Sequence, residues 1–257
     1  MSRCLPPPAR RLAIAWMVSI VPISLILACC AMSQPATAAV VVNPHDNGAT
    51  PTTPPAPDVA MRTTRPPFKG TIHAITPQMS AMMRESGSWK PGCPVRFGDL
   101  RLLKVTYWGF DQRAHTGKLV VHRDWAKRLV TVFRKLYGAR FAIRRMKLID
   151  EHGASDHRSM AADNTSAFNG RYVSGTTRWS MHAYGLAIDI NPVENPYVSG
   201  SHVSPEAGRK YVDRSRRAKG MIHDGDVVTR AFRSIGWKWG GDWSGTKDYQ
   251  HFSSTGG

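Results

Sequence analysis

Residues 180–189 read SMHAYGLAID, a pattern that predicts a loop followed by a short buried strand. His182 stands in the expected loop and Asp189 lies seven positions later in the expected strand. Gly185, between them, permits a tight turn or a close approach of two backbone segments. Such a turn could bring the imidazole and the carboxylate to one point, where both are possible ligands of a metal ion. The same residues would also fit a buried strand whose polar ends have no function. A metal site would need further ligands from elsewhere in the chain.

The composition describes a folded, strongly basic protein. Its 257 residues suit one domain with appendages or two small domains. A hydrophobic content of 42% and eight tryptophans are enough for a sizeable core. The formal net charge of +17 predicts an anionic partner, which could be nucleic acid, a membrane surface or a polyanionic cell wall.

The N-terminus favours an exported protein. Three arginines precede the apolar run at 12–32, and Ala36-Thr37-Ala38 fits the small-x-small pattern of signal cleavage. We therefore predict that residues 1–38 are a signal peptide or an N-terminal membrane anchor, with lipid attachment at Cys29 as a weaker option. The protein would be secreted or held in the cell envelope at the outer face of the cytoplasmic membrane. Its membrane contact would be limited to this segment, and loss of the leader arginines leaves a charge of +14.

The remaining chain divides into a linker and a folded domain. Residues 39–74 are rich in proline, threonine and alanine and predict a disordered linker, so the domain is expected at 75–257. Cys93 is the one cysteine beyond the leader, which excludes an internal disulfide and a thiolate metal cluster.

Periodicity predicts a mixture of helices and strands. The expected helix at 76–86 has Thr76 as its N-cap and Pro77 at its first position. The expected helix at 123–138 has Trp125, Leu129, Phe133 and Leu136 on one face and ends at Gly138. A third helix is expected in the stretch 226–237, with Gly236 as its stop. Strands are expected at 99–111, 116–124, 141–149, 165–173, 186–192 and 249–254. Because helices and strands do not alternate regularly, the predicted class is α+β.

His251 is the best candidate for a third ligand. It lies in the strand-like sequence YQHFSS near the C-terminus. Two histidines, Asp189 and a water molecule would form an open hydrolytic site. Asp248 precedes His251 by three residues and is a candidate general base. Taken singly, each residue has an ordinary structural explanation, since the chain has ten histidines and either aspartate could belong to a turn.

The two motifs together resemble a known family. SMHAYGLAIDINP and the later WGGDWSGTKDYQHF are similar to the VanY-like D-alanyl-D-alanine carboxypeptidases and the L-alanyl-D-glutamate endopeptidases of phage endolysins. The family pattern is Ser-x-His-x-x-Gly-x-Ala-x-Asp followed by a distant carboxylate-x-x-His. The matching residues are Ser180, His182, Gly185, Ala187, Asp189, Asp248 and His251. The resemblance covers about residues 90–254 and implies a small, mostly antiparallel sheet with flanking helices, as in the hedgehog-like fold.

The resemblance also implies roles for individual residues. His182, Asp189 and His251 would bind one zinc ion, and Asp248 would be the catalytic base. The family uses an arginine ahead of the first ligand to bind substrate oxygens, and Arg171 is its best match here.

Other positions bear on the substrate. Arg158 is the alternative to Arg171 as the substrate arginine, and Ser180 and Tyr184 are further expected substrate contacts. The aspartate at position 248 slightly favours the endopeptidases, because the D-Ala-D-Ala enzymes tend to have glutamate there. Many relatives have cysteine where this chain has Gly170, which would leave Cys93 without its partner.

The expected function is an exported zinc metallopeptidase that hydrolyses peptide bonds in the stem peptides of peptidoglycan. Its partners would be those peptides and the anionic cell wall, with no nucleic acid. A non-catalytic, zinc-dependent wall-binding module is one alternative, and Asp248 argues against it. A basic nucleic-acid-binding protein is another, and the signal-like leader argues against that.

Overall fold

The computed structural model describes residues 65–256. The predicted leader and the first part of the predicted linker lie outside these residues. The helices are α1 Pro77–Ser86, α2 Arg123–Gly138, α3 Asp156–Ala161 and α4 Val227–Arg233. The strands are β1 Gly70–Ala74, β2 Leu100–Gly109, β3 Ala114–His122, β4 Ala142–Ile143, β5 Ala187–Asp189, β6 Tyr197–Ser199, β7 His202–Ser204, β8 Lys238–Trp239, β9 Lys247–Asp248 and β10 His251–Ser253. The 3-10 turns are η1 Phe97–Asp99, η2 Ile149–His152, η3 Met181–Tyr184, η4 Glu206–Tyr211 and η5 Gly240–Asp242.

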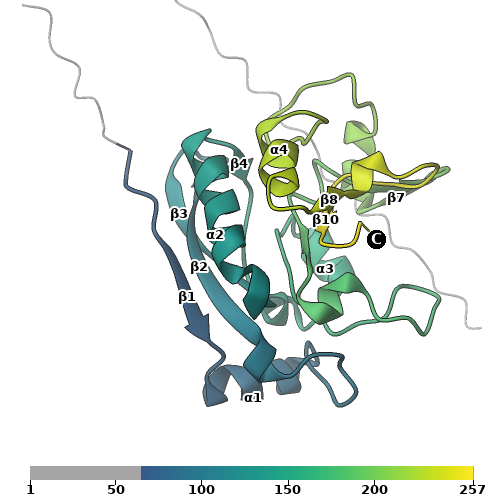
Figure 1. Ribbon diagram of the computed structural model, residues 1–257. Helices are drawn as coiled ribbons and strands as arrows, with labels where there is room; N and C mark the ends of the chain where they lie inside the picture. Colours follow the sequence, from purple (N-terminus) through teal and green to yellow (C-terminus); the bar gives the residue numbers. More distant parts are fainter. Residues whose placement is uncertain (1–64, 257) are drawn as a thin grey trace, which may run out of the picture. The chain divides into compact units, whose positions relative to one another are not determined.

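The first sheet is built on the long β2–β3 hairpin. Strand β1 pairs antiparallel with β2 on the edge opposite β3, and the short β4 pairs parallel with the end of β2. Helix α2 packs against β2, as Figure 1 shows. Leu129, Phe133 and Leu136 of α2 are all buried, which is the apolar face that the sequence predicts.

Two small antiparallel sheets complete the fold. In one, β10 lies between β5 and β8, and in the other β6 lies between β7 and β9. The pairing of β10 with β5 places His251 directly opposite Asp189. Residues from distant parts of the sequence are therefore adjacent because of strand register.

The site strands are anchored in the main hydrophobic core. Ile188 of β5 and Phe252 of β10 are fully buried in the same cluster as Leu103 and Phe133 from the first sheet and α2. Phe252 also stacks on Phe232 of α4 at a centroid distance of 4.1 Å. The polar residues that flank these two apolar side chains are consequently held on rigid strands.

The α+β class is confirmed, with small antiparallel sheets and few helices. Thr76 caps α1 by accepting a hydrogen bond from the Met79 backbone, as predicted. Within residues 65–256, no helix combines the length and the apolar character needed to cross a membrane.

Several predicted boundaries differ from the structure. The folded part includes β1, which lies within the predicted linker. Its residues are mostly exposed, so its sequence lacks the alternation of apolar and polar side chains that would have predicted a strand. The strand expected at 141–149 is reduced to Ala142–Ile143, and 165–173 is held by isolated bridges instead of a strand. Gly138 is the last residue of α2, and the chain reverses at Arg140, which has a φ of 55°.

Candidate metal centre

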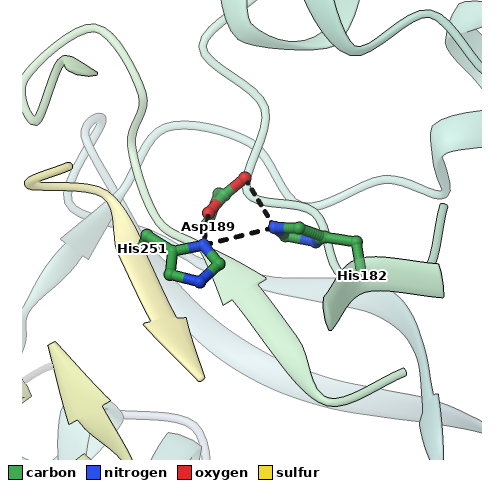
Figure 2. Close-up of side chains that lie close together, drawn as sticks. All are labelled: His182, Asp189 and His251. Atoms are coloured by element: carbon green, nitrogen blue, oxygen red, sulfur yellow. Dashed lines mark hydrogen bonds and ion pairs between the residues drawn. The ribbon is translucent and has the colours of Figure 1, made fainter. Parts of the chain in front are cut away.

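Three side chains converge where β5, β10 and the turn η3 meet (Figure 2). The Nε2 atom of His182 lies 3.1 Å from Asp189 Oδ2, and Nδ1 of His251 lies 3.0 Å from Asp189 Oδ1. The two imidazole nitrogens are 3.3 Å apart. All three residues are buried, and their donor atoms form a compact triangle that could hold one metal ion.

Local hydrogen bonds fix the turn that carries His182. The Ser180 hydroxyl caps η3 by accepting a hydrogen bond from the His182 backbone at 3.3 Å. Gly185 ends the turn with a φ of 68°, and its carbonyl accepts a hydrogen bond of 2.9 Å from the His122 backbone at the end of β3. A Cβ at position 185 would lie 2.6 Å from that backbone nitrogen. The glycine of the motif therefore serves both the left-handed turn and the close approach to β3.

Replacing Gly185 with alanine is expected to lower the free energy of unfolding by about 2 kcal/mol or more, because backbone strain and a backbone clash add. Urea unfolding of the purified protein measures this loss. Gly200→Ala is the matched control, since Gly200 has a φ of 56° but open space around its Cβ position. A loss at Gly185 no larger than that at Gly200 would contradict the clash.

The protonation of His182 favours a cation at this point. Its Nδ1 lies 2.6 Å from the Ala167 carbonyl, which can only accept a hydrogen bond, so Nδ1 carries a proton. In the neutral ring, Nε2 then presents a lone pair toward the Asp189 carboxylate. A lone pair facing an anion is stabilised by a cation that both can bind, and a carbonyl on the other ring nitrogen is the usual support of a metal-binding histidine.

The electrostatics of the three residues agree with this geometry. Burial raises the pKa of Asp189, but the neighbouring His182 and His251 outweigh it and hold that pKa well below its usual range. Burial lowers the pKa of His182, and the Asp189 carboxylate outweighs this effect and raises the pKa overall. The site thus favours an ionised carboxylate with positive charge beside it.

The donor set fits zinc. Nitrogen and oxygen donors at about 2.0–2.1 Å from a tetrahedral ion lie roughly 3.3 Å from one another. The two imidazole nitrogens are 3.3 Å apart, and each lies 3.0 or 3.1 Å from a different oxygen of the Asp189 carboxylate. Three protein ligands leave a fourth position for water or substrate, which is typical of catalytic zinc sites and not of structural ones.

Asp248 lies in the same cavity without being one of the three converging residues. It belongs to β9, opposite Tyr197 of β6, and a Cβ at Gly240 would lie 2.5 Å from its carbonyl oxygen. The residue is partly buried, but its Oδ1 is shielded from solvent and has no hydrogen-bond partner within the described part of the chain. Burial, the largest effect, raises the pKa of Asp248 to about 7. A carboxylate with this pKa beside a metal centre is suited to proton transfer.

A cavity of about 1170 Å³ gives access to these residues. Arg171 lines it and forms an ion pair of 2.9 Å with Asp156 at the start of α3. Arg158 does not line it, and its guanidinium donates instead to the carbonyls of His152 and Gly153. Of the two predicted arginines, Arg171 is the one that lines the cavity beside His182, Asp189 and His251.

Of the other two expected substrate contacts, Ser180 lines the cavity and Tyr184 does not. Ser180 lines the cavity, although its hydroxyl is used in the cap of η3. Tyr184 requires a correction, because it packs against the second hydrophobic cluster with Leu100 and does not line the cavity. Trp243 does line it, with its ring 5.7 Å from that of His251.

Some cavity residues could not be found from the sequence. Asp156, Tyr172, Arg178 and His202 line the cavity but belong to no motif, and only their contacts show their place. The free thiol of Cys93 lies where a side chain at Gly170 would point, since a Cβ there would be 2.5 Å from its Sγ. This proximity agrees with the pairing that the resemblance implies for relatives with cysteine at position 170.

Comparison with known families gives one match. Residues 174–254 match a family model described as D-alanyl-D-alanine carboxypeptidase. The matched span includes His182, Asp189, Asp248 and His251, and it begins after Arg171. The comparison with curated proteins gave no match, and the comparison with solved structures gave none either.

Proposed function

Since the match over residues 174–254 supports the VanY-like peptidase family, we propose that this protein is a zinc-dependent peptidase that cleaves stem peptides of peptidoglycan. The observation that carries the proposal is the convergence of two imidazoles and one carboxylate beside the separate, partly buried carboxylate of Asp248. A non-catalytic zinc module has no use for this fourth group, whose Oδ1 is shielded from solvent at a cost in free energy and has no hydrogen-bond partner among the described residues. The placement of Asp248 therefore favours catalysis over binding alone.

Each residue has a distinct role in the proposed reaction. His182, Asp189 and His251 would hold the zinc ion. When bound, zinc would act as a Lewis acid toward the scissile carbonyl and lower the pKa of water in the site. Asp248 accepts the proton of the attacking water and returns it to the leaving amine.

Arg171 is suited to orient the substrate. Arg171 lines the cavity, and Asp156 holds its guanidinium by the 2.9 Å ion pair. A planar guanidinium can bind a carboxylate or carbonyl oxygen of the substrate with a remaining N–H group. Stem peptides present such oxygens at the D-residues.

Two bonds in a stem peptide are candidates for cleavage. The family description favours the terminal D-Ala-D-Ala bond, whereas an aspartate base favours the L-Ala-D-Glu bond. Tyr197 and His202 line the cavity together with residues between 171 and 181, and its 1170 Å³ exceeds the need of a dipeptide. This size supports an internal bond, so we favour the endopeptidase over the D,D-carboxypeptidase.

The proposed location follows from the leader and the charge. A signal peptide or membrane anchor at 1–38 would place the domain outside the cytoplasm, where its substrate is. The formal charge of +17, or +14 without the three leader arginines, would attract the protein to the carboxylates and phosphates of a cell wall. Nucleic acid is not a proposed partner.

Digestion of defined muropeptides, followed by mass analysis of the products, tests the proposal. Loss of one D-Ala and cleavage between L-Ala and D-Glu give different masses. A chelator is expected to abolish product formation, and added zinc is expected to restore it. An intact substrate after incubation with the zinc-loaded protein would refute the peptidase.

The pH dependence of the reaction is expected to report the base. Asp248 works only as the carboxylate, so activity falls as the pH drops through its pKa, which is about 7 without a metal ion. A nearby cation favours the ionised form, so the acidic limb of kcat/KM should lie at or below about pH 7. Metal content measured across the same range separates this limb from loss of zinc at low pH. A rate that stays constant down to pH 4 with zinc retained would contradict the assignment.

A further inference from the structure

An exposed aromatic side chain lies at the edge of the active-site cavity. Within residues 65–256, Tyr172 and Ile72 are the only large apolar side chains that are exposed, and Tyr172 is 45% exposed. Tyr172 lines the cavity, whereas Ile72 does not. An exposed aromatic ring at the mouth of a cavity has a hydration cost that a ligand would relieve, so its place suggests a contact with substrate.

A rigid loop presents this ring. Tyr172 and Trp179 pair across an antiparallel bridge, and their rings lie 4.1 Å apart at an interplanar angle of 31°. Between them, the Val173 backbone donates to the Arg178 carbonyl at 2.9 Å, and the Thr176 hydroxyl donates to the Val173 carbonyl at 2.9 Å. Lys90 lies over the Trp179 ring, with its Nζ 6.0 Å from the centroid. The ring of Tyr172 is therefore held in place before any ligand binds, which reduces the entropy lost on binding.

The surroundings of the ring are polar. Ser174 and Arg178 line the cavity beside Tyr172, and no carboxylate of residues 65–256 lies within ion-pair distance of Arg178. One flat apolar face among hydroxyl and guanidinium donors does not suit an aliphatic side chain. It suits a pyranose ring, whose C–H face packs on the aromatic ring while its hydroxyl and acetamido groups meet the polar donors.

We propose that Tyr172, whose ring packs against that of Trp179, forms a saccharide-binding subsite that recognises the glycan attached to the stem peptide. The inference rests on the proposed function, because a stem peptide in the wall is joined through its N-terminal end to an amino sugar. The short path along the cavity wall from His182 through Ser180 and Arg171 to Tyr172 connects the metal centre to this subsite. The protein would then prefer glycan-linked peptides to free peptides.

The preference can be measured as a ratio. The two substrates are one stem peptide joined to the disaccharide N-acetylglucosaminyl-N-acetylmuramic acid and the same peptide without sugar. For the zinc-loaded wild type, kcat/KM is expected to be about fivefold or more higher for the linked substrate, mainly through KM. Tyr172→Ala is expected to bring the ratio close to one, and Tyr172→Phe, which keeps the ring, is expected to preserve it. Ile72→Ala, which removes the other exposed apolar side chain, is the control that should keep the wild-type ratio.

Direct binding separates this inference from the proposed reaction. The disaccharide alone is titrated into wild type and Tyr172→Ala, with tryptophan fluorescence and thermal melting as readouts. Saturable binding that Tyr172→Ala abolishes, without cleavage of either substrate, would support the subsite and refute the peptidase. Cleavage with a wild-type ratio of one, or a ratio unchanged in Tyr172→Ala, would overturn the subsite and leave the peptidase intact. Absence of both binding and cleavage would overturn the subsite as well.

Discussion

Replacing Asp248 with asparagine is expected to lower kcat by about 10²–10⁴-fold, the range for loss of a positioned general base. Asparagine keeps the size of the side chain but cannot accept the proton of the attacking water. The change also removes the charge of a partly buried carboxylate whose shielded Oδ1 has no partner within residues 65–256, so the fold should not be weakened. The three residues proposed as zinc ligands remain in place, and the variant should bind zinc as the wild type does.

Single-turnover and steady-state kinetics on a defined stem peptide measure the effect, with zinc content determined on the same samples. Asp213→Asn is the matched control, since Asp213 is exposed, accepts a hydrogen bond from the Ser215 hydroxyl and does not line the cavity. The control should keep the wild-type rate. Normal turnover of Asp248→Asn with a full zinc content would show that Asp248 is not the base. Another residue that lines the cavity would then have to accept the proton.

Local patterns explain which parts of this fold the sequence predicts. Helix α2 has a regular apolar face that gives a clear helical period, and the sequences of β2 and β3 are rich in the β-branched, leucine and aromatic residues that favour strands. The strands β5 and β10 are only three residues each, yet they were expected because apolar side chains flank the polar residues of the motifs. In each of these short motifs, the apolar residues that form a buried strand stand next to the polar residues that the strand positions, so the sequence shows both.

The parts that could not be predicted depend on contacts between distant segments. Strand β1 is mostly exposed and exists through its pairing with β2. Asp156 and Arg171 are fifteen positions apart in sequence, and their ion pair depends on where α3 packs. The side chain of Tyr184 could not be placed from the sequence for the same reason. Tyr184 lies two positions after His182 in the motif, but its side chain packs against the second hydrophobic cluster and not in the cavity.

The register of β5 and β10 brings two of the three proposed ligand residues together. Antiparallel pairing places His251 opposite Asp189, with the buried pair Ile188 and Phe252 beside them. A slip of one residue would move both polar side chains to the core face, and the hydrophobic cluster forbids it. The geometry of the metal centre is therefore a consequence of core packing.

Replacing His251 with alanine is expected to abolish both zinc binding and hydrolysis. The remaining two ligands, His182 and Asp189, cannot hold the ion with comparable affinity. The loss should also appear in stability, because an ion bound only by the folded state at 100 times its Kd stabilises the wild type by about 2.7 kcal/mol. We therefore expect added zinc to raise the Tm of the wild type and to leave the Tm of the variant unchanged.

Zinc content after dialysis, and Tm with and without added zinc, measure this result independently of activity. His115→Ala is the matched control, because His115 is exposed, pairs with Asp111 and does not line the cavity. It should bind one zinc ion and show the wild-type rise in Tm. Two results would contradict the site in different ways. Zinc retained by His251→Ala would mean that the ion is held elsewhere, and a wild type that gains no stability from zinc would mean that the triangle of donors around Asp189 does not bind it.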